Sequence, residues 1–234
     1  MVCFKNCQFS GGTISVAESS VALTNCLFER VTVSFNDDED IGHWYLQNNL
    51  FRGGSLSYRM NYFPNGTRGL AYDNLFDRTA ISTGNGTFTN GYNAYVTNYS
   101  TLSSSQGNDR ILTNSPVYQT SYLGTYYYPT NDGMLSTLID AGSRYATNAG
   151  LYHFTTTTNQ VKEAGTIVDI GFHYVAVDPN TGQPYDTDGD GVPDYLEDTN
   201  GNGNGADDLT SWQVYNSPNG LVSGSGLQVF TPLK

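Results

Sequence analysis

Asn48-Asn49-Leu50-Phe51 is one of four copies of a short pattern that predicts the fold of this chain. The other copies are Asn6-Cys7-Gln8-Phe9, Asn25-Cys26-Leu27-Phe28 and Asp73-Asn74-Leu75-Phe76, so that their first residues lie 19, 23 and 25 positions apart. A weaker fifth copy is Gly91-Tyr92-Asn93-Ala94-Tyr95. A pattern that recurs every 20–25 residues or so is typical of a solenoid, in which each coil packs on the next.

The residues between the copies alternate between apolar and polar side chains, as in Thr13-Ile14-Ser15-Val16 and Val31-Thr32-Val33-Ser34-Phe35. This alternation predicts short strands with one buried face. We therefore expect a parallel β-helix, with the recurrent Phe and Leu stacked inside. The recurrent Asn should stack at a turn, because Asn tolerates the left-handed backbone and its amide can bond the next coil. The variable spacing keeps an antiparallel sandwich as the alternative.

Composition supports strands and limits the possible partners. Charged residues make up only 14% of the chain, whereas it holds 18 Tyr and 26 Gly, which favours strands and turns over long helices. The net charge is −12, and eight of the acidic residues fall within 186–208, where there is no Lys or Arg. This local charge indicates a bound cation. Nucleic acid is not expected as a partner, because no basic stripe could neutralise phosphates.

Three cysteines, Cys3, Cys7 and Cys26, lie in the first strand-rich stretch. An odd number does not make a disulfide framework, so we expect buried free thiols, with a Cys7–Cys26 bridge as the alternative. No run of about 18 apolar residues could span a membrane. No signal peptide is visible either. We therefore expect that the sequence is a piece of a longer protein, with further coils upstream of Met1.

The repeats and two later motifs carry a resemblance to a known family. Residues 1–123 resemble bacterial right-handed parallel β-helix surface proteins, in which an Asn-containing turn followed by Leu-Phe recurs in each coil. Leu138–Ser143 and Val168–Tyr174 look like the segments that close such helices. The resemblance implies an all-β fold, namely a right-handed parallel β-helix whose cap spans residues 124–177. Within the cap, Asp140 and Asp169 are expected to serve turns rather than catalysis.

Residues 186–197 fit the calcium-loop pattern D-x-D-x-D-G-x-x-D-x-x-E. Calcium takes about six to eight oxygen ligands, and alternate residues of a tight loop can supply them. Gly191 allows the sharp turn at the sixth position. The predicted ligands of Ca²⁺ are the carboxylates of Asp186, Asp188, Asp190, Asp194 and Glu197 and the backbone carbonyl of Val192.

A second, degenerate copy begins twelve residues further on. It is expected to bind more weakly, because Asn replaces Asp and the ninth and twelfth positions hold Ala206 and Leu209. Asp207 and Asp208 could supply the missing acidic ligands at these positions if the loop contains one extra residue. The predicted weaker site is Asp198, Asn200, Asn202, Asp207 and Asp208. The two copies resemble thrombospondin type 3 repeats, which implies an extracellular calcium-stiffened spacer. A solvated acidic linker is the alternative.

Many parallel β-helices cleave acidic polysaccharides, so that an active site is a further possibility for this chain. Glycosidases need two carboxylates about 5–9.5 Å apart across a groove. The weak candidates Asp37, Asp38 and His43 fall within eight consecutive residues, with no third element on another coil. We therefore expect a polar loop there, and structural roles for His43, His153 and His173.

The sequence as a whole predicts coils over 1–123, a cap over 124–177, a calcium spacer over 178–208 and the start of a further module over 209–234. We expect a monomeric, noncatalytic protein at the cell surface or outside the cell, with adhesion or the binding of a glycan or cell-wall component as its role. The alternative is a polysaccharide lyase or glycoside hydrolase of the β-helix type.

Overall fold

The computed structural model describes residues 1–37, 42–60, 67–84, 87–102 and 106–215. The chain forms two compact units, each of which is described by itself. The first unit contains Met1–Pro116, Gly133–Ser143 and Asp169–Phe172, and the second contains Val117–Asp132, Arg144–Val168 and His173–Lys234.

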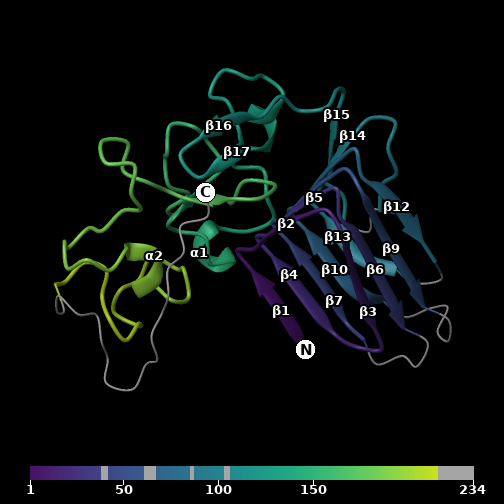
Figure 1. Cartoon of the computed structure of the whole chain (residues 1–234), viewed down its shortest axis with the longest axis horizontal. Coiled ribbons are helices and arrows are strands. Elements are labelled where there is room, and N and C mark those ends of the chain that lie inside the picture. The colour runs from purple at the N-terminus through teal and green to yellow at the C-terminus, as the bar shows by residue number, and fades with distance from the viewer. Residues whose placement is uncertain (38–41, 61–66, 85–86, 103–105, 216–234) are drawn as a thin grey trace. The chain divides into compact units, whose positions relative to one another are not determined.

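Three parallel sheets build the first unit, and successive coils add one strand to each sheet (Figure 1). The first sheet orders β1 (Val2–Lys5), β4 (Val21–Thr24), β7 (Trp44–Gln47), β10 (Thr67–Tyr72) and β13 (Thr87–Gly91). The second orders β15 (Arg110–Leu112), β14 (Ala94–Val96), β11 (Leu75–Asp77), β8 (Leu50–Arg52), β5 (Leu27–Glu29) and β2 (Gln8–Ser10). The third orders β12 (Ala80–Thr83), β9 (Ser55–Met60), β6 (Thr32–Asp37) and β3 (Thr13–Ala17). The all-β parallel solenoid is confirmed, and the antiparallel sandwich is wrong.

A column of aromatic rings runs through the core of the solenoid. Phe9, Phe28, Phe51, Phe76 and Tyr95 stack with ring centroids 5.1, 4.7, 5.1 and 5.2 Å apart and nearly parallel planes. Parallel strands in register place equivalent side chains at the same height of adjacent coils, which brings each ring over the next. The expected Phe stack is therefore confirmed. Leu27, Leu50 and Leu75, which precede three of these rings in the sequence, are buried as well. They lie on the opposite face of the same strands, because successive side chains of a strand alternate.

The turn before the second sheet has a left-handed backbone in every copy of the pattern. The φ angles are 57°, 49°, 53° and 62° at Asn6, Asn25, Asn48 and Asp73. The sequence predicted this conformation. Asn25 also donates from Nδ2 to Asn6 Oδ1 at 2.9 Å, which is the predicted rung between coils.

The buried amide ladder, however, runs through the next position of the repeat. Asn49 Nδ2 donates to Asn74 Oδ1 at 2.9 Å, and Asn74 Nδ2 donates to Asn93 Oδ1 at 3.0 Å. The backbone N–H groups of Cys26, Asn49 and Asn74 bond the Oδ1 of the following rung at 2.9, 3.1 and 3.0 Å. Each amide thus satisfies buried polar groups of a turn that no strand ladder reaches.

All three cysteines are free. Cys26 is buried at the ladder position and directs its Sγ toward the carbonyl oxygens of Phe4 and Thr24, at 3.4 and 3.3 Å. Burial raises the pKa of its thiol to about 12, which keeps it protonated. Cys3 is exposed, so that the prediction of a buried thiol is wrong for that residue.

Two later segments of the first unit are attached to the turns of the coils. The backbone N and Oγ of Ser143 donate to Asp73 at 2.6 and 2.8 Å, and Asn48 Nδ2 donates to the carbonyl of Asp169 at 3.2 Å. Asp169 Oδ1 in turn accepts the N–H of Asp140, whose φ is 51°. The first segment contains the 3₁₀ helix η1 (Leu135–Leu138). The carboxylate of Asp169 thus serves a turn, as the sequence predicted, and Asp140 contributes its left-handed backbone to that turn. The range predicted as the cap is divided between the two units.

The second unit has little regular structure. Its elements are β16 (Gln119–Ser121), β17 (Gly124–Tyr127), α1 (Ala146–Ala149), β18 (Phe154–Thr155), β19 (Tyr174–Val175) and α2 (Asp194–Glu197). β16 pairs with β17 and β18 pairs with β19, both antiparallel. Among the described residues, no helix has the length and apolar character needed to cross a membrane. Most of the range predicted as a further module, 216–234, lies outside the described residues.

Candidate metal centre

The loop that begins at Asp186 is shaped by hydrogen bonds from its backbone to its own carboxylates. Asp186 accepts the N–H groups of Gly189 and Gly191 at 2.9 and 3.0 Å. Both glycines have positive φ, 75° and 95°, a conformation that costs a residue with a Cβ about 1–2 kcal/mol. The loop therefore turns sharply where the sequence predicted it.

Asp188 and Asp190 each use one carboxylate oxygen to accept a hydrogen bond within the turn, and the other oxygen of each is buried. Asp188 Oδ1 accepts the N–H of Asp190 at 3.1 Å, and Asp190 Oδ1 accepts the N–H of Val192 at 2.8 Å. The second oxygens of Asp188 and Asp190 are buried and have no hydrogen-bond partner among the described residues. Asp190 itself is only 5% exposed. A buried carboxylate oxygen without a partner is costly, and a cation would satisfy it.

Asp186, Asp188 and Asp190 each offer a carboxylate oxygen, and these oxygens lie within 4.8 Å of one another. Burial raises the pKa of Asp188, and the negative charges of Asp190, Asp186 and Asp194 raise it further. Like charges held this close favour either a proton or a cation. The donor set is all oxygen, which suits Ca²⁺ or another hard cation.

The other predicted ligands of this loop lie in or near α2. Val192 is half-buried and precedes the helix by two residues, and Glu197 is buried at its last position. Both could complete the shell of a cation bound by the three acids. Of the carboxylates predicted as ligands in this loop, the structure brings together those of Asp186, Asp188 and Asp190.

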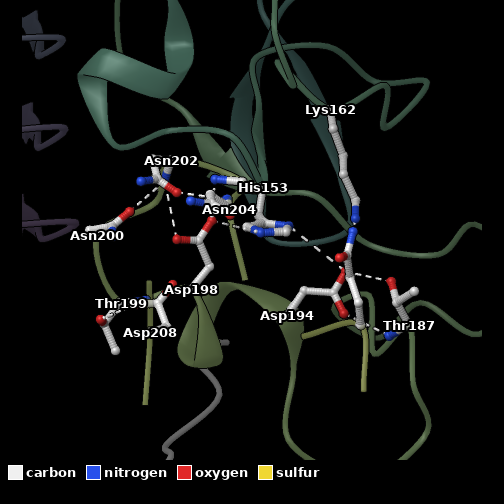
Figure 2. A network of polar contacts seen from close by, with 12 residues as sticks. His153, Lys162, Thr187, Asp194, Asp198, Thr199, Asn200, Asn202, Asn204 and Asp208 are labelled. Carbon is white, nitrogen blue, oxygen red and sulfur yellow. Dashed lines mark hydrogen bonds and ion pairs between the residues drawn. The ribbon is translucent and has the colours of Figure 1, made fainter. Parts of the chain in front are cut away.

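Asp194, at the ninth position, is engaged elsewhere (Figure 2). Its Oδ1 accepts the N–H of Thr187 at 2.6 Å, and its Oδ2 accepts Thr187 Oγ at 2.7 Å and Lys162 Nζ at 2.9 Å. Oδ2 also lies 3.8 Å from Nδ1 of the buried His153. Because Asp194 is only 1% exposed, its negative charge is stable in the interior only with these hydrogen-bonding and charged partners.

The second loop repeats the backbone geometry of the first. Gly203 N–H bonds Asp198 Oδ2 as Gly191 N–H bonds Asp186 Oδ2, and the two glycines have φ of 81° and 95°. The third and fifth positions also correspond, because Asn202 N–H bonds Asn200 Oδ1 at 2.9 Å and Asn204 N–H bonds Asn202 Oδ1 at 2.7 Å. The sequence repeat is thus a structural repeat.

Two residues are inserted before the ninth-position acid of the second loop. Asp208 Oδ1 accepts the N–H and the Oγ–H of Thr199 at 3.1 and 2.6 Å, and Asp194 accepts the same two groups of Thr187 on Oδ1 and Oδ2. Asp194 follows Thr187 by seven residues and Asp208 follows Thr199 by nine. Asp208 therefore stands in the place of Asp194 with respect to these bonds, and the insertion is two residues rather than the one that the sequence suggested. Its role as a calcium ligand stays a prediction.

Other polar groups of the second loop bond one another. Asp207 accepts Asn202 Nδ2 at 2.9 Å and Asn200 Nδ2 at 3.5 Å. Burial alone would raise the pKa of Asp198, but contact with His153, whose Nε2 is 3.0 Å away, and the N–H groups of Gly203 and Asn202 outweigh it and lower the pKa. Asp198 is therefore held as a buried carboxylate.

The second loop is docked on the body of its unit, whereas the glycines of the first loop face open space. Tyr152 N–H bonds the carbonyl of Gly201 at 3.0 Å. A methyl group at Gly201 would overlap the carbonyl of Gly150, and one at Gly203 would overlap the ring of Tyr152. At Gly189 and Gly191, an added methyl group would meet nothing within 4 Å. Trp212 closes the docked side, with its ring 5.0 Å from that of His153.

Lys162 and Thr187, which hold the first loop, were not predicted from the sequence, and neither were the contacts that His153 makes with Asp194 and Asp198. His153 and Lys162 lie far from the loops in the sequence, and no local pattern marks them. Thr187 and Thr199 could have been found, because each directly follows the first acid of its loop. His153 has the structural role that was predicted, and His173 pairs with buried Glu163 at 3.1 Å.

Two of the weak catalytic candidates, Asp37 and His43, lie in the described part of the chain and differ in burial and contacts. Asp37 is buried at the end of β6, and its Oδ2 accepts the N–H of Gly42 at 2.8 Å. His43 is exposed, and its backbone N–H bonds Ser20 Oγ. Asp38 lies outside the described residues. The geometry of Asp37 is that of a structural carboxylate.

Comparisons with known proteins add no assignment. No protein-family model matches the chain, no curated protein matches it, and no solved structure matches it. The function of the chain must therefore be inferred from the site itself.

Proposed function

We propose that this protein is a noncatalytic β-solenoid whose second unit binds structural calcium in the loop 186–197. The observation that carries the proposal is the pair of buried oxygens, one on Asp188 and one on Asp190, that have no hydrogen-bond partner among the described residues. They belong to a group of three carboxylates within 4.8 Å. A divalent cation would offset most of the negative charge of this group and replace the missing bonds.

Calcium fits better than magnesium. Calcium accepts about six to eight oxygens in a flexible shell, whereas magnesium requires a near-ideal octahedron and keeps several waters. Asp186, Asp188 and Asp190, the carbonyl of Val192 and the carboxylate of Glu197 could supply such a shell from one short loop. We assign a weaker calcium site to the second loop, with Asp198, Asn200, Asn202, Asp207 and Asp208 as its residues. Neutral amide oxygens attract a cation less than carboxylates do.

The expected affinity indicates where the protein works. Extracellular calcium modules bind with a Kd of about 10⁻⁴–10⁻³ M, which suits a compartment where calcium is constantly available. We therefore place the protein outside the cell or on its surface, where the ion would stiffen the loops and slow their proteolysis. Within this proposal the solenoid presents a surface for a glycan or a cell-wall component.

The calcium proposal is tested by isothermal titration calorimetry of the whole chain with calcium chloride. We expect binding at submillimolar to millimolar concentration, and at least a tenfold loss of affinity in Asp190→Asn, because the change removes one charge from the shell. Asp178→Asn is the matched control, since Asp178 accepts the N–H of Asn180 in a turn outside the loops and an amide oxygen can do the same. Wild-type protein that releases no heat with calcium would contradict the proposal.

The noncatalytic role is tested separately. The wild-type chain should be retained on a glycan array or on cell walls without releasing reducing or unsaturated sugars from polysaccharides. The buried bond between Asp37 and the Gly42 N–H supports this assignment. Sugar release that is lost in Asp37→Asn would favour the polysaccharide-degrading alternative.

A further inference from the structure

We infer that Lys162 sets the calcium affinity of the loop 186–197, because its ammonium group is a fixed counter-charge to Asp194 beside the cation site. The inference rests on the proposed calcium function and deepens it. Lys162 lies outside both loops, in the segment that leads from β18 toward β19, and the calcium-loop pattern does not include it.

The ammonium group of Lys162 occupies a defined place. Its Nζ lies 2.9 Å from Asp194 Oδ2 and 4.3 Å from the centre of the Tyr185 ring, and the side chain is 21% exposed. Trp212 contributes a second ring at 5.8 Å. A lysine held between a buried carboxylate and aromatic faces cannot move freely into solvent. Its charge therefore acts on the loop permanently.

Asp194 is a positioning residue in this arrangement. Thr187 donates to both of its oxygens, and Lys162 donates to Oδ2. The carboxylate could approach a cation only by giving up these bonds inside the protein, where their loss is expensive. Asp194 thus contributes charge and loop position, and Asp186, Asp188 and Asp190 provide the direct carboxylate contacts.

The charge of Asp194 nevertheless lies beside the cation site, because both of its oxygens bond Thr187, which stands between Asp186 and Asp188 in the chain. Lys162 offsets that charge. Removing the positive charge of Lys162 leaves the site more negative and should tighten calcium binding. Removing the negative charge of Asp194 leaves the ammonium uncompensated and should weaken binding. A purely structural pair would behave differently, because breaking it from either side would loosen the loop and change affinity in the same direction.

The test is calcium calorimetry on the whole chain at low ionic strength, with charge varied at both residues. Lys162→Gln keeps a hydrogen-bond donor but loses the charge, and we expect calcium to bind about threefold to tenfold tighter. Asp194→Asn should bind about threefold to tenfold more weakly, and the double variant should return to within about twofold of wild type. Lys162→Arg keeps the charge and should match wild type.

Ionic strength provides an independent readout. The increase in calcium affinity of Lys162→Gln over wild type should shrink markedly between about 10 mM and 500 mM salt, because the Debye length falls from about 30 Å to a few ångströms. Lys162→Met, which has no donor, should show the same gain if it folds.

The outcomes separate the two proposals. If wild-type protein binds no calcium, the proposed function fails and the inference fails with it. If wild-type protein binds calcium but Lys162→Gln binds equally or more weakly, only the inference is overturned. A double variant that stays as weak as Asp194→Asn would likewise overturn it, because Asp194 would then be a direct ligand.

Discussion

The two acidic loops of the second unit have the same backbone but differ in charge and in burial. In each loop, the first residue accepts the N–H of the glycine five positions later, and the third and fifth residues accept the N–H two positions later. Asp fills the third and fifth positions in the first loop and Asn fills them in the second. The turn needs only a side-chain oxygen, which Asp and Asn both supply.

The two loops suit two different roles, cation binding and attachment to the rest of the unit, although one sequence pattern describes both. The first loop exposes its glycines and concentrates carboxylates, which suits cation binding. The second loop lies against Gly150 and Tyr152 and directs its first acid at His153, which suits attachment to the rest of the unit. A repeat in a sequence therefore predicts a repeated shape more safely than a repeated ligand.

The largest difference is expected when an equivalent glycine is changed in each loop. Gly201→Ala should lower the free energy of unfolding by about 3–5 kcal/mol, since the left-handed backbone and an overlap with the Gly150 carbonyl both add cost. Gly189→Ala has the same backbone strain but open space, and should cost about 1–2 kcal/mol. Chemical denaturation measures both. Equal losses would show that the second loop is not docked as described.

A smaller effect, on calcium affinity, should follow when the second loop is made more negative and so more like the first. Asn202→Asp adds a carboxylate at the fifth position, where the first loop has Asp190, and should raise the calcium affinity of the second loop about fivefold to tenfold, because ligand charge tunes such sites. Calorimetry should show a clearer second binding step. Asn114→Asp, at an exposed position outside the loops, adds the same charge and controls for a general field effect. No change in the second step would mean that this loop does not hold calcium.

Much of the solenoid could be predicted because its signals are local and repeated. Asn6, Asn25 and Asn48 mark left-handed turns, and Phe28 and Phe51 mark the core, since each coil faces the same requirements as its neighbours. The amide ladder was placed one residue too early for most rungs. Asn at two adjacent positions of a repeat leaves open which of them points inward, and only the turn geometry decides.

The sequence predicted the positions of the first three acids of the candidate metal site but not the surroundings of Asp194. The positions of Asp186, Asp188 and Asp190 follow from a short pattern in which glycine fixes the turn. The environment of Asp194 depends on Lys162 and His153, which reach it from 32 and 41 residues away. Contacts of that kind are set by tertiary packing. The two-residue insertion before Asp208 was hidden because its match to Asp194 shows only in the bonds from Thr199.

The smallest expected effect concerns the two threonines that follow the first acid of each loop. Thr187→Val removes a hydroxyl bond to the buried carboxylate of Asp194 and should cost about 1 kcal/mol of stability. Thr199→Val removes the corresponding bond to Asp208, which is only partly buried, and should cost less than about 0.5 kcal/mol, because water can replace the lost donor. Both backbone N–H bonds survive in the variants, so that the comparison isolates the hydroxyl. Denaturant midpoints measured side by side would decide the matter, and a larger loss at Thr199 would show that the second loop carries more of the stability than its exposure indicates.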